Sequence, residues 1–177
     1  SCPMKLLLIL LLLAPTAFAS KKSESEAEVR RLTEESEKLA AKAAWSGVER
    51  TYVQLLALER RGGTVSHDVH VLAAHAAQDR GDPLTTWERL KAANAVEMKI
   101  ETLTWLAEIE ATYSRFEVTV APGYPETFEV TSLDPLFDPA HQETVARFAK
   151  NLVEQRYADA LLPLGRYRIA DDVVLES

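Results

Sequence analysis

Apolar residues recur every three or four positions between Trp45 and Tyr113, and this spacing is the strongest constraint on the fold. The spacing predicts amphipathic helices, because positions three or four apart lie on one face of an α-helix. The first helix is expected to end at residues 60–63, where two arginines precede two glycines. Ser66, a favourable N-cap residue, is expected to begin a second helix that runs to about Arg80.

Two further helices are predicted after the turn at residues 81–83. They span about residues 84–94 and 96–113. Small side chains such as those of Ala73 and Ala77 let neighbouring helices approach closely, which favours antiparallel hairpins that pack side by side. The last of these helices is apolar on two faces, so we expect it to lie between the helical stack and the C-terminal segment. One face has Val96, Ile100, Leu103 and Ala107, and the other has Met98, Trp105 and Ile109.

Residues 72–82 and 87–93 resemble one tetratricopeptide-type helical hairpin. The segment departs from that motif at Thr86, where alanine is usual, and at Ala77, where an aromatic residue is usual, and no proline closes the unit. The resemblance implies a stack of helical hairpins over residues 45–114, with a concave surface for another protein. The matching positions are the small residues Ala74 and Ala93, the turn residues Gly81 and Asp82, and the large apolar residue Leu90.

The hydrophobic period changes in the C-terminal third of the chain. Residues 116–120 and 127–131 alternate apolar with polar side chains, which predicts a β-hairpin or two neighbouring strands. Residues 138–139, an aspartate followed by a proline, are expected to begin a helix whose apolar stripe extends to Tyr157. Residues 166–176 predict two short strands around a turn of two aspartates.

These elements predict a small β-β-α-β-β unit over residues 115–177. Within it, residues 162–169 resemble the Pro-x-Gly-x-Tyr stretch of small exported β modules of the PEGA type. The resemblance implies a small β module in an exported protein. The predicted fold class is α+β, mainly α, with antiparallel tetratricopeptide-like hairpins followed by this unit.

Residues 4–19 have the three parts of a secretory signal peptide. A basic start precedes an unbroken apolar run at residues 6–13, and residues 17–19 present the small side chains that a signal peptidase accepts. We therefore expect residues 1–19 to be removed and Ser20 to begin a periplasmic or secreted protein. The apolar run is shorter than the roughly 20 residues of a membrane-spanning helix, which argues against an uncleaved anchor.

The chain has 27 acidic and 20 basic residues. An acidic excess disfavours nucleic acid and anionic membrane surfaces, since both attract clustered Lys and Arg. We therefore expect no nucleic-acid partner and a mature form that does not span a membrane. The single cysteine, Cys2, lies within the predicted signal peptide, so no disulfide is expected in the mature chain.

Residues 20–44 are rich in charge and poor in large apolar side chains. Opposite charges lie one helical turn apart, at Glu26 and Arg30 and again at Glu34 and Lys38. The pattern predicts a solvated lead-in helix or a partly disordered linker. A coiled-coil arm is the alternative, although sustained heptads are missing.

The sequence shows no recognisable catalytic or cofactor-binding pattern. It has no glycine-flanked serine on a strand-to-helix turn and no cysteine nucleophile in the mature chain. The glycine pair at residues 62–63 lacks the Lys-Ser or Lys-Thr that follows a phosphate-binding loop. We therefore expect no enzyme activity, no cofactor and no metal site.

Three histidines leave one alternative open. His67, His70 and His75 lie on one predicted helix near acidic residues, but their spacing of three and five does not place all three on one side. The alternative is an exported metal- or ligand-binding protein that uses the helix at residues 67–75.

The favoured prediction is an exported, non-enzymatic adaptor or scaffold that binds a protein partner in the cell envelope through the helical hairpins. The tryptophans at positions 45, 87 and 105 have helical spacing and fit a core, although some of them are suited to the groove between hairpins. The predicted partner-binding residues are Gln78, Arg89, Trp87 and Trp105, and Gln78 and Arg89 are expected to be exposed.

Overall fold

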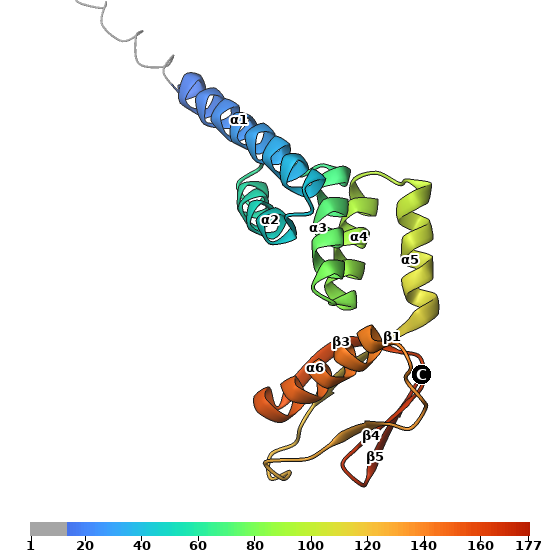
Figure 1. Cartoon of the computed structure of the whole chain (residues 1–177). Helices are drawn as coiled ribbons and strands as arrows, with labels where there is room; N and C mark the ends of the chain where they lie inside the picture. Colours follow the sequence, from blue (N-terminus) through green and yellow to red (C-terminus); the bar gives the residue numbers. More distant parts are fainter. Residues whose placement is uncertain (1–13) are drawn as a thin grey trace, which may run out of the picture.

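The computed structural model describes residues 14–177, so most of the predicted signal peptide, including its apolar run, lies outside the described residues. The helices are α1 (Ala14–Ala41), α2 (Trp45–Glu59), α3 (His67–Asp79), α4 (Pro83–Val96), α5 (Ile100–Thr112) and α6 (Pro139–Gln155). The strands are β1 (Tyr113–Thr119), β2 (Val130–Ser132), β3 (Tyr157–Pro163), β4 (Arg166–Ile169) and β5 (Val173–Glu176). Five helices precede a small module that contains all the described strands, which confirms the predicted fold class (Figure 1).

Helix α1 packs its C-terminal half onto α2 and α3. Leu32 is 1% exposed and belongs to a core cluster with side chains from both helices. One turn further on, Ser36 is also fully buried. A small polar side chain therefore occupies the buried face of α1, so this position carries no apolar signal in the sequence. Residues 20–44 therefore form more than a solvated lead-in, since part of α1 belongs to the packed body. The other members of this cluster are Tyr52, Leu55, Val65, Val69 and Ala73.

Helices α3 and α4 form an antiparallel hairpin, and the start of α3 is capped as the sequence predicts. The Ser66 hydroxyl accepts a hydrogen bond from the Val69 amide at 3.3 Å, and Asp82 caps α4, which has proline at its first position. Gly81 turns the chain between them with a φ of 73°, in the left-handed region that glycine adopts readily. Ala73, Ala74 and Ala77 are fully buried, which allows the two helices to approach closely.

Helix α5 joins the helical stack to the C-terminal module, as predicted. Its side chains Leu106 and Ile109 share a core cluster with Leu161 of strand β3. The prediction of two buried faces is only partly correct. Helix α5 begins at Ile100 rather than near Val96, and the Ile100 side chain is 70% exposed. The backbone at Lys99 is extended, with a ψ of 142°. A continuous helix from residue 96 is therefore not formed.

The C-terminal module has two antiparallel sheets and one helix. Strand β1 pairs along its length with β3, while β2, β4 and β5 form the second sheet in the order β2-β4-β5. The predicted hairpin between residues 116–120 and 127–131 is therefore wrong. The unit also has one more strand than predicted, because Arg156 adopts a left-handed backbone that ends α6 and starts β3 at Tyr157. Phe148, Leu152, Leu162 and Tyr167 are the most buried members of the module's core.

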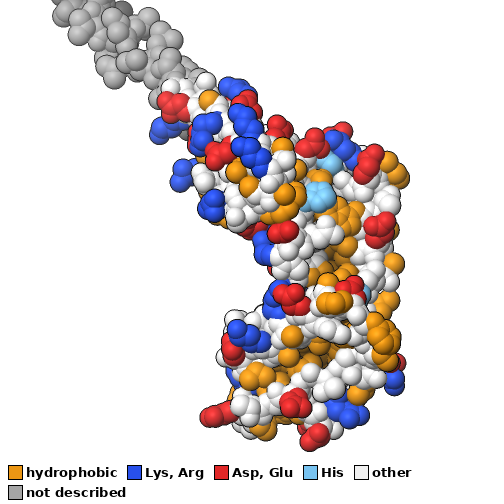
Figure 2. All heavy atoms as spheres, in the orientation of Figure 1, with side chains coloured by type: hydrophobic (Ala, Val, Ile, Leu, Met, Phe, Trp, Pro, Cys, Tyr) orange, Lys and Arg blue, Asp and Glu red, His pale blue; other side chains and the backbone are white. Residues whose placement is uncertain are grey.

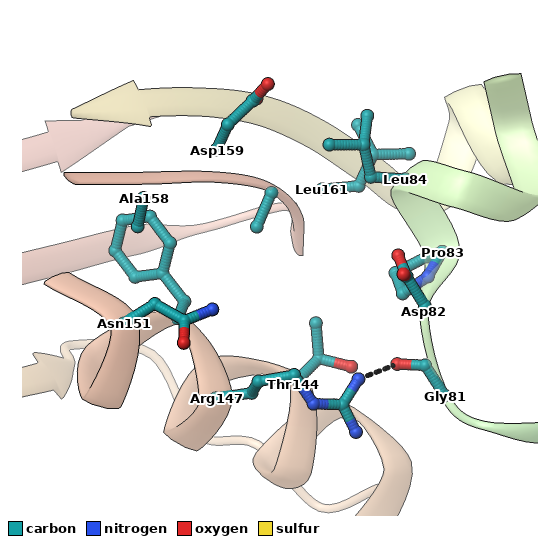
Figure 3. A pocket seen from close by; sticks show the side chains of 12 residues that line it. Gly81, Asp82, Pro83, Leu84, Thr144, Arg147, Asn151, Ala158, Asp159 and Leu161 are labelled. Atoms are coloured by element: carbon teal, nitrogen blue, oxygen red, sulfur yellow. Dashed lines mark hydrogen bonds between the residues drawn. The ribbon is translucent and has the colours of Figure 1, made fainter. Parts of the chain in front are cut away.

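One side chain fastens the module to the hairpin. Arg147 of α6 donates a hydrogen bond to the Gly81 carbonyl at 2.7 Å (Figure 3). It donates another to the Arg80 carbonyl at 3.2 Å. These carbonyls lie at the C-terminal end of α3, where the helix leaves its acceptors unpaired and where a cation is favoured. The module is thereby held beneath the helical stack (Figure 1).

The packing of α1 predicts a measurable loss of stability in Leu32→Ala. We expect its free energy of unfolding to fall by about 2–5 kcal/mol, because the substitution leaves a cavity between three helices. Leu164→Ala is the control, since Leu164 is 51% exposed and its truncation should cost less than about 0.5 kcal/mol. Urea unfolding followed by circular dichroism measures both. Equal effects of the two substitutions would show that α1 does not contribute to the core.

Candidate functional site: a groove between two helices

A groove runs between α3 and α5, with α4 behind it. Two pockets form the groove, and Trp105 lines both of them. The pocket at the start of α3 has a volume of about 410 Å³, within the usual range for ligand sites, and the pocket at its end has about 200 Å³. We call this feature the α3–α5 groove. The α3 side chains that line it are His67, Asp68, Val71, Leu72, His75 and Gln78, and those from the α5 side are Lys99, Glu101, Thr102, Trp105, Ile109 and Tyr113.

The groove is large enough for a short extended peptide. Positions 67, 71, 75 and 78 recur at helical spacing along α3, so they mark one face of that helix. At about 1.5 Å per residue this face spans about 17 Å, which equals about five residues of extended chain. On the surface shown in Figure 2, hydrophobic side chains gather over α3, α4 and α5 next to exposed histidine.

An aromatic row extends across the groove onto α2. Trp45 of α2 stacks on His75 of α3 with their ring centres 5.8 Å apart, and His75 lies 4.6 Å from the ring of Trp105 of α5. His75 is exposed, yet the two indoles desolvate it and lower the pKa of its imidazole. The middle ring of the row is therefore neutral at neutral pH. We call these three side chains the aromatic row.

A polar network links α3 to α5 where both helices begin. His67 is buried, with Nδ1 at 2.8 Å from Asp68 Oδ1 and Nε2 at 2.8 Å from Thr102 Oγ1. Asp68 also accepts a hydrogen bond from Lys99 Nζ at 2.9 Å. Hydrogen bonds from His67 and Lys99 lower the pKa of the Asp68 carboxyl, which favours its charged form. The network fixes the width of the groove at this end.

The structure does not bring the three histidines of α3 together. His67 uses both ring nitrogens in the network, His70 is buried with Nδ1 at 2.9 Å from the Tyr52 hydroxyl, and His75 belongs to the aromatic row. Within residues 14–177, no group of three or more His, Cys, Asp or Glu side chains is placed to hold a metal ion.

Two of the four predicted partner-binding residues lie together. Gln78 and Trp105 line the same pocket of the groove. Trp87 lies elsewhere, since its Nε1 donates to Glu110 Oε1 at 3.0 Å and the Lys91 ammonium lies 4.2 Å from its ring centre. Its helix, α4, forms the back of the groove.

Arg89 is a structural residue, so the expectation that it is exposed is wrong. Its side chain is 12% exposed and donates two hydrogen bonds to the Glu49 carboxylate, at 2.5 and 2.6 Å. It also donates to the Ala73 carbonyl at 2.9 Å and lies over the Tyr52 ring. These hydrogen bonds lower the pKa of Glu49, and they tie α4 to α2 and α3.

A second, smaller pocket lies between the helical stack and the module (Figure 3). Its volume is about 100 Å³, well below that of typical ligand sites. Three charged side chains line it, and each has a partner. Asp82 caps α4, Arg147 binds the carbonyls at the end of α3, and Asp159 accepts two hydrogen bonds from Arg115, at 2.8 and 2.6 Å. All three charged side chains are therefore engaged in hydrogen bonds within the protein.

Comparison of the chain with protein-family models, with curated proteins and with solved structures finds no significant match. The helices of residues 14–177 include none with both the length and the apolar character that crossing a bilayer requires.

The Arg89–Glu49 pair predicts a stability effect that separates a structural from a binding role. Arg89→Met should lower the free energy of unfolding by about 2–3 kcal/mol, because it leaves the half-buried Glu49 carboxylate without its main donor. Arg166→Met removes a comparable but exposed partner of Asp134 and should cost at most about 1 kcal/mol. Urea unfolding compares the two variants. A similar small effect in both would contradict a structural role for Arg89.

The buried His70 predicts that stability falls in mild acid. Burial lowers the pKa of His70, so below about pH 6.5 the unfolded chain binds a proton that the folded chain does not. The free energy of unfolding should therefore decrease as the pH falls below that value. His70→Asn keeps an acceptor for the Tyr52 hydroxyl and should reduce this pH dependence, whereas His141→Asn should leave it in place. Thermal unfolding across the pH range tests this, and an unchanged slope in His70→Asn would exclude His70 as its source.

Proposed function

We propose that this protein is an exported, non-enzymatic adaptor that binds an extended segment of a protein partner in the α3–α5 groove. The observation that supports the proposal best is the aromatic row, with an exposed His75 between two half-buried indoles, at the edge of a groove of peptide size. Tryptophan is favoured at the centre of protein interfaces, because a large ring buries much area at a small entropy cost.

The surface beside the groove supports the same function. Val96, Met98 and Ile100, at the junction of α4 and α5, are 50%, 71% and 70% exposed. Large apolar side chains that cluster on a surface commonly mark an interaction site. We propose that the hairpins are of the tetratricopeptide-like kind, in which neighbouring helices present a concave surface to a bound segment.

Export is the second part of the proposal, and it rests on the signal-peptide pattern of residues 4–19. The partner would then be a protein of the cell envelope or of the extracellular space. The proposed mature chain lacks cysteine, so its stability in an oxidising compartment would come from the three core clusters and from the hydrogen bonds of Arg89 and Arg147.

A pull-down with matched variants tests the proposed function. The purified protein is used as bait in an envelope extract, alongside a double variant, His75→Ala with Gln78→Ala, and a control, Glu88→Ala, on exposed α4 surface. Both groove side chains are exposed, so the double variant should fold normally. We expect a partner that wild type and control retain and that the double variant binds at least about tenfold more weakly.

Circular dichroism confirms the fold of each variant before the comparison. A partner that the groove variant retains as well as the control does would show that another surface binds it. The groove would then lose its assigned role.

A further inference from the structure

We infer that the segment bound in the α3–α5 groove is basic, with a Lys or Arg side chain seated on the aromatic row. This inference deepens the proposed function and rests on it. It follows from the mainly acidic lining of the groove and from the two half-buried indoles that have no cation of the protein over them.

The lining of the groove is mainly acidic. Four carboxylates line its two pockets, whereas Lys99 is the single Lys or Arg side chain among the lining residues. Lys99 is already paired, because its ammonium lies 2.9 Å from the Asp68 carboxylate. A cationic segment would therefore be attracted along the groove, and an anionic one repelled. The four carboxylates are those of Asp68, Asp82, Glu101 and Glu143.

Other aromatic rings of the protein already hold a cation. Lys91 lies over Trp87 at 4.2 Å, Arg89 lies over Tyr52 at 4.8 Å, and an arginine of the module lies over Phe128 at 5.5 Å. Within residues 14–177, neither Trp45 nor Trp105 has such a partner. Tryptophan is the best of the three aromatic side chains for this contact, so two half-buried indoles without a cation lie beside the acidic lining of the groove.

The neutral state of His75 fits this occupant. A protonated imidazole between the two indoles would repel a Lys or Arg head group, whereas the neutral ring extends the aromatic surface. A segment of about five extended residues can place one cationic side chain on the row while its backbone follows the groove toward Gln78, whose amide can hydrogen-bond to it.

Two other occupants fit the charge less well. A second copy of this chain would bring further acidic surface to the groove, because the chain has a net charge of −7. Nucleic acid and anionic membranes would meet the same carboxylates and be repelled. A basic peptide segment is the occupant that matches both the walls and the row.

Titration with synthetic peptides tests the inference. One heptapeptide alternates arginine with glycine and serine, a second has citrulline in place of arginine, and a third has glutamate there. Citrulline keeps the size and the hydrogen-bonding groups but removes the charge. We expect the arginine peptide to quench tryptophan fluorescence and to bind at least about tenfold more tightly than the citrulline peptide, with an affinity that falls as salt is added.

Protein variants locate the binding. Trp45→Leu should weaken the arginine peptide about tenfold, whereas Trp87→Leu, which changes a ring already covered by Lys91, should have little effect. If Trp45→Leu does not fold, the double variant Glu101→Gln with Glu143→Gln, which removes two charges from the lining of the groove, replaces it. The matched control, Glu88→Gln with Glu154→Gln, changes the same number of exposed charges outside the groove.

The outcomes separate this inference from the proposed function. Equal affinity for the arginine and citrulline peptides, or preference for the glutamate peptide, would overturn the basic segment and leave a groove-dependent partner in the pull-down unaffected. A groove-dependent dimer in sedimentation would also overturn it, since the occupant would then be a second copy. If the groove double variant retained the pull-down partner as well as wild type does, the proposed adaptor function of the groove would itself be contradicted.

Discussion

The close packing of α3 on α4 is the interaction on which the rest of the structure depends. Fully buried alanines let the two backbones approach, and Arg89 then reaches from α4 to the Glu49 carboxylate on α2 and the Ala73 carbonyl on α3. A planar guanidinium can make a two-point contact with a carboxylate and still donate to a carbonyl, which an ammonium group does less well. One side chain thus holds three helices in a fixed relation.

The groove is a consequence of this packing. The alanines of α3 face inward, so its larger side chains, such as Val71 and His75, lie on the side toward α5. Helix α5 packs on α4 through Leu90 and Leu106, and the network of His67 and Thr102 sets its distance from α3. Trp105 packs against the edge of this cluster and is half-buried, whereas His75 beside it is exposed.

The sequence predicted the features that depend on local signals, such as the cap at Ser66, the turn at Gly81 and the fold class. The pairing of β1 with β3 was missed, because it joins segments about 40 residues apart and the strand at Tyr157 follows directly after α6. Of the predicted partner-binding residues, Gln78 and Trp105 line one pocket of the groove. The aromatic row was not predicted, since Trp45 comes from a different helix, although the helical spacing of His67, Val71, His75 and Gln78 would have indicated the α3 wall.

The C-terminal module helps to form the groove, because α6 contributes Glu143 and Thr144 to the pocket that also contains Gln78. Arg147, one turn after Glu143, is fixed to the carbonyls at the end of α3, so the wall of that pocket cannot move independently of the helix that faces it. A cation at this helix end is favoured both by the unpaired carbonyls and by the helix dipole. The contact that fastens the module to the hairpin therefore also defines the lower end of the proposed binding site.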